Sequence, residues 1–106
     1  MNIRDLLCML RALQMMSPRQ RRAFFELASV HQLKVFEQAC YNLLKNPRGL
    51  TVKQLKEARK YSRNIRILAR PNYTIEQKRA LLKQRGGFLG ALLPLLGTIV
   101  SAVISR

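Results

Sequence analysis

Acidic residues are scarce in this sequence of 106 residues. Five Asp and Glu stand against twenty Lys and Arg, so the net charge is +15. The five carboxylates are scattered and form no catalytic pair or motif, which leads us to expect no enzyme activity and no cofactor. They are Asp5, Glu26, Glu37, Glu57 and Glu76. Because so large a charge repels itself in a compact chain, we expect an anionic partner, and phosphate in particular.

Metal-binding and nucleophilic residues are equally few. The chain has two cysteines, Cys8 and Cys40, and one histidine, His31. A zinc site needs more Cys or His ligands than this set supplies, so we expect no metal. A Cys–His nucleophile pair would lack a third group to orient the histidine. Both cysteines lie in apolar helical surroundings, and we predict buried, reduced thiols in place of a disulfide framework.

Alternating apolar and polar runs are also missing, which excludes long half-buried strands. The apolar run at residues 6–10 is broken at Arg11 and is too short for a secretory signal, so we expect an intracellular protein. Apolar residues make up 48% of the chain and recur at regular spacing, so one small hydrophobic core can form. We therefore predict an all-α fold.

Four Ser/Thr-x-x-Gln segments mark helix starts. In this pattern the hydroxyl and the glutamine side chain each satisfy a free backbone N–H at the helix N-terminus. The segments begin at Ser17, Ser29, Thr51 and Thr74. Together with the apolar spacing, they predict a bundle of four to five short helices, followed by a separate apolar C-terminal helix. The predicted bundle helices are 3–16, 18–27, 30–45, 52–69 and 75–84.

Two apolar stripes define the expected core. The first lies on helix 3–16 and consists of Ile3, Leu6, Leu7, Leu10 and Leu13. The second lies on helix 30–45 and consists of Leu33, Phe36, Ala39, Cys40 and Leu43. Their helical spacing predicts that the two stripes face each other. We expect Phe24, Phe25 and Leu27 to close one end of this core.

A ladder of basic residues runs along the predicted helix 52–69. Its members recur every three or four residues, which gathers them on one side; they are Lys53, Lys56, Arg59, Lys60, Arg63, Arg66 and Arg70. Like charges at this spacing destabilise an isolated helix, so the ladder is either a solvated face or the site of an anion. The global charge favours nucleic acid, bound through its phosphates without sequence specificity and expected to be DNA.

Additional basic residues suggest that binding spreads over much of the surface. They are Arg19, Arg21, Arg22, Lys34, Lys45, Arg48, Lys78, Arg79, Lys83 and Arg85. Three tyrosines, Tyr41, Tyr61 and Tyr73, have two interpretations: they cover the margin of the core, which we favour, or they stack on bases. The sequence contains no zinc-finger, homeodomain or aromatic RNA-binding motif.

The charge pattern changes abruptly at Arg85. Residues 1–85 form a basic segment, whereas residues 86–105 carry no charge, so we divide the chain into a basic helical domain, 1–85, and an apolar tail, 86–106. The apolar residues of the tail are Phe88, Leu89, Leu92, Leu93, Leu95, Leu96, Ile99, Val100, Val103 and Ile104. As a helix the tail would reach about 28 Å, close to the roughly 30 Å of a bilayer's hydrocarbon.

Three environments for this tail stay open: a membrane, a protein assembly, or the domain itself. A helix that is apolar all round must be buried somewhere. A domain of this size offers little surface to cover it, so we favour a membrane or an assembly. The small residues Gly90, Ala91, Gly97, Ser101 and Ala102 would suit close packing against another helix.

Residues 83–104 resemble a known family. Arg85-Gly86-Gly87, followed by Phe88 and a tail rich in Leu, Pro and Ile, is similar to the C-terminal part of the adenovirus core protein X precursors, the source of the mu peptide. The whole chain also resembles small proteins of the adintoviruses and Maverick/Polinton elements. The resemblance implies a virion-internal, DNA-condensing protein, active in the virion and the host nucleus, whose Gly-Gly is cut by a viral cysteine protease.

The cleavage that this resemblance implies concerns residues Gln84, Arg85, Gly86, Gly87 and Phe88. Adenovirus-type cleavage prefers Met, Ile or Leu two residues before Gly-Gly, and this chain has Gln84 there. We expect a non-enzymatic core protein that binds and condenses nucleic acid and is anchored by its tail to capsid or membrane. The alternatives are a membrane-active, inserting or lytic protein, and a capsid cement or oligomerising minor structural protein.

Overall fold

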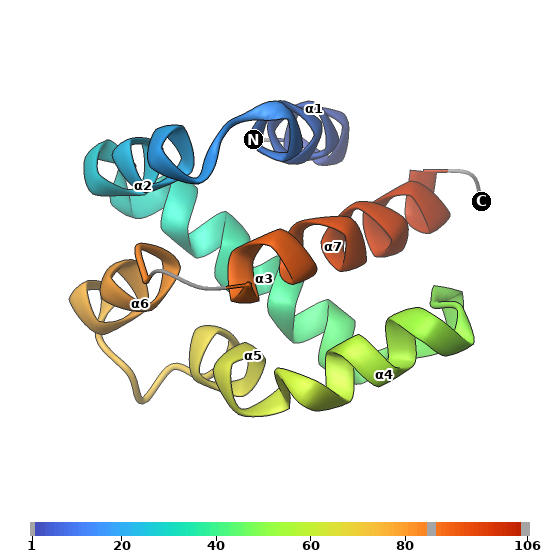
Figure 1. Ribbon diagram of the computed structural model, residues 1–106. Helices are drawn as coiled ribbons and strands as arrows, with labels where there is room; N and C mark the ends of the chain where they lie inside the picture. The colour runs from blue at the N-terminus through green and yellow to red at the C-terminus, as the bar shows by residue number, and fades with distance from the viewer. Residues whose placement is uncertain (1, 85–86, 105–106) are drawn as a thin grey trace.

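The computed structural model describes residues 2–84 and 87–104, and over this part of the chain it contains seven α-helices, one short 3-10 helix and no strand (Figure 1). The prediction of an all-α fold is confirmed. The helices are α1 (Ile3–Met15), α2 (Pro18–Leu27), α3 (Val30–Lys45), η1 (Pro47–Gly49), α4 (Val52–Lys60), α5 (Ser62–Ala69), α6 (Ile75–Leu82) and α7 (Phe88–Ile104).

All four capping boxes form at the predicted helix starts. In each box the Ser or Thr hydroxyl accepts from the backbone N–H of the Gln, and the Gln side-chain oxygen accepts from the backbone N–H of the Ser or Thr. These reciprocal bonds begin α2, α3, α4 and α6. The start of α1 is capped differently, because the Asn2 side chain accepts from the backbone N–H of Asp5 at 2.9 Å. Local hydrogen bonding therefore fixes where five of the helices begin.

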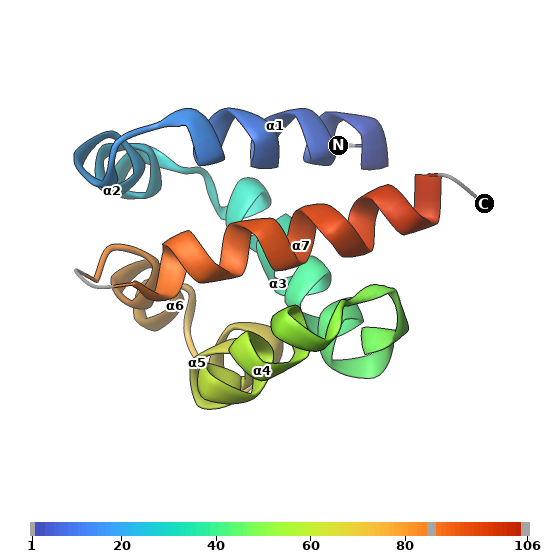
Figure 2. The ribbon, with the colours of Figure 1, turned by 45° about the vertical axis from the view of Figure 1, so that its right-hand side comes forward.

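Helix α7 runs through the centre of the molecule. Figure 2 shows it between α1 on one side and α4 and α5 on the other, with α3 crossing behind. Its most extensive packing is against α1, and it also contacts α3, α4 and η1. Eight of its residues are buried, and they belong to the same hydrophobic core as the buried residues of α1, α3 and α5. The separate apolar helix that we expected from the sequence is thus replaced by a central helix.

The burial of α7 changes how the two apolar stripes meet. The stripe on α3 is buried throughout, as predicted. On α1 only Leu10 and Leu13 are fully buried, while Leu6 and Leu7 are partly covered and Ile3 is exposed. The main partner of α1 is α7, and α3 packs mainly on α5 and then on α7. The two stripes therefore pack mainly on other helices, because α7 supplies a third apolar surface.

The side of α7 that faces away from the core is made of small residues. Gly90 and Pro94 are exposed, and a methyl group added at Gly97 would meet no atom within 4 Å. Pro94 cannot donate to the carbonyl of Gly90, but this side of the helix is open to water, which can satisfy that oxygen. Of the small residues expected to pack closely, Gly90 is exposed, whereas Ala91, Gly97, Ser101 and Ala102 are half-buried, and a methyl group at Gly49 of η1 would lie 3.6 Å from the Cβ of Ala102.

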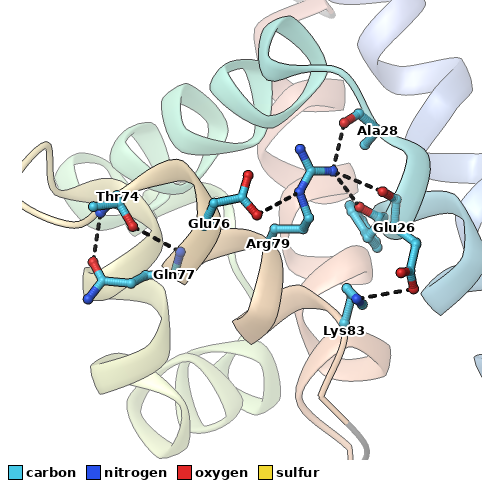
Figure 3. Close-up of polar contacts among 8 residues, drawn as sticks. Glu26, Ala28, Thr74, Glu76, Gln77, Arg79 and Lys83 are labelled. Carbon is cyan, nitrogen blue, oxygen red and sulfur yellow. Dashed lines mark hydrogen bonds and ion pairs between the residues drawn. The ribbon is translucent and has the colours of Figure 1, made fainter.

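Two arginines predicted to bind anions instead hold helix C-termini. The guanidinium of Arg79, on α6, donates to the carbonyls of Phe25, Glu26 and Ala28 at 2.9, 3.3 and 2.7 Å (Figure 3). Arg21 donates to the carbonyls of Leu13 and Gln14 at 2.7 and 2.9 Å. Each guanidinium satisfies carbonyls left free at a helix end and opposes the negative pole of the helix dipole.

Lys78 of the same helix and Lys83, its C-cap, also form ion pairs within the fold. Lys78 is only 2% exposed, and its Nζ lies 2.9 Å from Oε1 of Glu37 on α3. The Nζ of Lys83 lies 3.1 Å from a carboxylate oxygen of Glu26 (Figure 3). The cations of α6 and its C-cap thus attach this helix to α2 and α3. The other additional basic residues include four that are exposed: Arg19, Lys34, Lys45 and Arg48.

The environments of the cysteines and of the aromatic cap differ in part from prediction. Cys40 is buried as expected, but Cys8 is exposed, and both are free thiols. Phe25 is fully buried and stacks edge-on with Phe36 at 5.1 Å, so it closes the core as predicted. Leu27, by contrast, is 86% exposed at the end of α2 and contributes nothing to the core.

Candidate nucleic-acid interface

The predicted basic helix 52–69 is divided at Tyr61. The backbone of Tyr61 has φ −105° and ψ 16°, outside the helical range, so α4 ends at Lys60 and α5 begins at Ser62. The ring of Tyr61 turns inward and lies 5.6 Å from the ring of Phe88, at the start of α7. The break therefore lies where Tyr61 contacts α7. The spacing of the basic residues, which assumes one straight helix, does not predict this contact.

All seven predicted binding residues are exposed in spite of this break. Lys53, Lys56, Arg59 and Lys60 lie on α4, and Arg63, Arg66 and Arg70 lie on or directly after α5. Their spacing of three and four residues continues from one helix into the next, since Lys60 is followed by Arg63 and Arg66. We call this set the α4–α5 basic surface. The two helices that carry it, α4 and α5, lie at the bottom of the view in Figure 1.

The opposite side of α4 and α5 is attached to the core. Ile65 and Leu68 are each 1% exposed, and Leu55 and Ala58 pack against the buried cluster. A hydrogen bond of 2.9 Å joins the side-chain nitrogen of Gln54 to the hydroxyl of Thr98 on α7. Because the apolar side is fixed in this way, the basic side must point outward.

The α4–α5 basic surface has no carboxylate partner among the residues that the structure describes. The ion pairs found there join Lys78 to Glu37, Arg79 to Glu76 and Lys83 to Glu26, and all involve cations of α6 or of its C-cap. On the basic surface itself, Lys60 lies 5.4 Å from the centre of the Tyr61 ring. The seven cations share one helical carboxylate, Glu57, with which none forms an ion pair, so their mutual repulsion favours a bound anion.

A small groove lies at the α5 end of this surface. Arg63, Arg66, Ile67, Arg70 and Tyr73 line it. Tyr73 follows the turn that connects α5 to α6 and is half-buried. Nothing in the sequence distinguishes Tyr73 from the other tyrosines, because its place beside three arginines depends on the direction of this turn.

The other two tyrosines have different surroundings. Tyr61 is half-buried at the core margin, against Phe88. Tyr41 is exposed on α3, where Lys45 lies 5.2 Å from the centre of its ring. Only Tyr73 therefore combines partial burial with a groove among free arginines.

The residues of the expected cleavage site lie partly outside the described part of the chain, because Arg85 and Gly86 are not described. Gln84 and Gly87 are exposed, but Phe88 is only 7% exposed. A methyl group at Gly87 would approach the Tyr61 hydroxyl to 3.1 Å, so a larger residue there would have to displace the tyrosine. Gly87 and Phe88, at the start of α7, thus both lie close to Tyr61, the residue at which α4 and α5 are divided.

Cys40 has surroundings that suppress its chemistry. Burial raises the pKa of its thiol to about 12, although the nearby Lys78 opposes this effect. A thiol with that pKa stays protonated at neutral pH and is a weak nucleophile. Within residues 2–84 and 87–104, no group of three His, Cys, Asp or Glu residues is placed to hold a metal ion.

Comparisons with known proteins give no family for this chain. No protein-family model matches it, and no curated protein or solved structure matches it significantly. Among the helices of the described residues, none is long and apolar enough to cross a membrane. Functional inference therefore depends on the geometry and charge of the chain itself.

Proposed function

We propose that this chain is a non-enzymatic basic protein that binds nucleic acid without sequence specificity, through the α4–α5 basic surface. The observation that supports the proposal is the exposure of seven cations on two successive helices, none of which forms an ion pair with a residue in the described part of the chain. Phosphates spaced along a nucleic acid strand would relieve the repulsion among these cations. Binding would release the counterions condensed on the nucleic acid, which makes the affinity strongly dependent on salt.

The sequence resemblance to adenovirus core protein X precursors suggests a setting for this activity. In that setting the protein would neutralise and bridge packaged DNA inside a virion. The contribution of the basic surface to this role is charge alone, because phosphate contacts position a protein on DNA without reading its bases.

The sequence predicted that the tail anchors the protein to capsid or membrane, and this proposal gives the tail a structural role in its place. Anchoring to capsid or membrane through residues 88–104 would require α7 to leave the core. That would expose eight buried residues, each contributing roughly 1.5–3 kcal/mol, which together rival the stability of a whole domain. We therefore assign α7 to the fold and the binding function to α4 and α5.

The proposal is tested by titrating a fluorescent DNA duplex with the full chain at 50 to 200 mM salt. We expect the logarithm of the affinity to fall linearly with the logarithm of the salt concentration. Replacing Lys53, Lys56, Arg63 and Arg66 with Ala should reduce the steepness of this slope by about 3 to 4, since each phosphate contact contributes about 0.9.

A matched control removes four exposed cations from elsewhere on the molecule: Arg4, Arg11, Arg19 and Lys34, which lie on α1, α2 and α3. This variant loses the same net charge but keeps the α4–α5 basic surface. We expect it to bind more tightly than the first variant by at least about tenfold. Equal weakening of the two variants would contradict a localised interface, and salt-independent or absent binding would contradict the function.

A further inference from the structure

We infer that the groove between α5 and the turn that follows it is a site for single-stranded nucleic acid, in which Tyr73 stacks on a base while Arg63, Arg66 and Arg70 bind the flanking phosphates. The inference rests on the proposed function and goes further, because it names one part of the basic surface and one class of ligand. It is based on the residues that line the groove.

The three arginines of the groove gather on one side of α5. Arg63 and Arg66 are three residues apart, and Arg66 and Arg70 are four apart, so their side chains project from the same face. All three are exposed, and none forms an ion pair with a residue that the structure describes. Guanidinium groups bind phosphate through two parallel hydrogen bonds, so this cluster suits a phosphate-bearing ligand.

Tyr73 adds an aromatic face to this cluster. It is half-buried and shares the groove with the apolar side chain of Ile67. A free phosphate would not contact an apolar, aromatic surface, whereas a nucleotide has both a charged phosphate and a flat base that can lie against the ring. Any base can stack on an aromatic ring, so a stacking site is compatible with binding that lacks sequence specificity.

The position of Tyr73 is fixed from both sides. Helix α5 ends where the backbone N–H of Arg70 donates to the carbonyl of Arg66 at 3.1 Å. The next residue after Tyr73 is Thr74, the N-cap of α6, which forms a capping box with Gln77 through bonds of 2.7 and 3.1 Å. The backbone is therefore held on both sides of Tyr73, which lowers the entropic cost of ordering this turn on binding.

Duplex DNA can contact the arginines of this groove but cannot stack a base on Tyr73 while the duplex stays closed. Its bases are stacked on each other and paired, so the Tyr73 ring could reach one only after the duplex opened locally. A single strand presents unstacked bases at no such cost. The groove therefore predicts a preference for single strands on top of the charge attraction that any nucleic acid experiences.

The test compares three fluorescent ligands by anisotropy with the full chain at constant salt: a dT 12-mer, a 12-mer of abasic sites and a duplex of the same length. The abasic strand keeps the phosphates and lacks the bases. We expect the dT strand to bind at least about fivefold more tightly than the abasic strand, the lower end of the effect of stacking one base.

Variants then locate the difference. Tyr73→Leu should bring the affinity for the dT strand down to that for the abasic strand and leave the abasic and duplex affinities unchanged. Tyr73→Phe keeps the ring and should bind like the unaltered chain. Tyr41→Leu removes an exposed tyrosine from α3 and should have no effect.

The outcomes separate this inference from the proposed function. Equal affinity of the unaltered chain for the dT and abasic strands would overturn the stacking site, and it requires no variant to fold. Equal loss of dT and abasic binding in Tyr73→Leu would also overturn it, because the preference for a strand with bases would then persist without the Tyr73 ring. Either result leaves charge-driven binding in place, whereas absence of binding to all three ligands would remove the proposed function as well.

Discussion

The two cysteines illustrate how much the position of a single residue decides. Both lie in helices with apolar neighbours in the sequence, yet Cys40 is fully buried and Cys8 is exposed. On α1 the positions that face the core are Leu10 and Leu13, and Cys8 lies off that stripe. On α3, Cys40 lies within the buried stripe and close enough to Lys78 and Glu37 to feel their charges.

We predict that the two thiols differ sharply in reactivity. At pH 8 one equivalent of a thiol reagent should label Cys8 within minutes, while Cys40 should react only after unfolding in denaturant, because its raised pKa and its burial both protect it. Mass spectrometry of the labelled protein identifies the site, and Cys8→Ser is the control. Rapid labelling of both cysteines in the folded protein would contradict the burial of Cys40.

The same pKa shift has a consequence for stability. The folded state holds the thiol of Cys40 in its neutral form, with a pKa of about 12 against 9.0 for a free thiol. The stabilisation is therefore complete below pH 9 and is lost progressively as the pH rises from 9 towards 12. At physiological pH it is fully present.

Basic residues likewise divide into two kinds that their sequence neighbours do not distinguish. Arg79 donates to three carbonyls at the end of α2, whereas Arg66 is exposed on the α4–α5 basic surface. Both arginines lie within helices, and both were predicted from the sequence to bind anions. The difference depends on which helix end lies opposite the guanidinium, and that is a property of the packing.

At the scale of elements, α7 gives the clearest contrast between pattern and structure. Its buried face includes Leu93 and Leu96, neither of which is exposed, and its open side includes Gly97. A helix of this kind has two sides that differ in residue size more than in polarity. Hydrophobicity alone does not show which side faces the core.

We predict opposite effects for two adjacent substitutions in α7. Leu96→Ala should lower the free energy of unfolding by about 3–5 kcal/mol, because it leaves a cavity in the core. Gly97→Ala should raise it by about 0.5–1 kcal/mol, since a methyl group fits there and Ala favours the helix. Urea denaturation monitored by circular dichroism measures both.

The outcome decides whether α7 belongs to the fold. A tail outside the domain would leave the urea midpoint unchanged in Leu96→Ala. Loss of stability in Gly97→Ala would indicate that this side of α7 is covered by another part of the molecule.

The division of the predicted helix 52–69 belongs to the same scale. The basic residues predicted from their spacing to be exposed are exposed on both sides of the break, so their exposure was predictable from the sequence. The break itself was not, because Tyr61 is an ordinary helical residue by sequence, and its inward contact with Phe88 involves a residue far along the chain.

Over the whole molecule, the net charge of +15 acts against compactness. The cations of α6 are paired, so the repulsion is concentrated among the exposed residues, including the α4–α5 basic surface. Salt screens such charges over about 10 Å at 0.1 M. Stability should therefore depend on ionic strength even without a ligand.

We predict that raising NaCl from 10 to 150 mM increases the midpoint of thermal unfolding by a few degrees, because screening relieves the repulsion in the folded state. Differential scanning calorimetry measures the change. The variant with Ala at Lys53, Lys56, Arg63 and Arg66 is the control, and its midpoint should respond less. An equal response would place the repulsion outside the basic surface.

The sequence alone determined where α1, α2, α3, α4 and α6 begin and which basic residues are exposed on α4 and α5. Both depend on residues three or four positions apart, so the information is local: a capping box joins Ser17 to Gln20, and Lys60 and Arg63 are three positions apart. Only the tertiary structure decided the place of α7, the division of the arginines between exposed ones and ones held by carbonyls within the fold, and the position of Tyr73. The sequence of an apolar helix specifies that it must be buried but not by what. Here α1, α3 and α4, which are far from α7 in the sequence, cover its buried face.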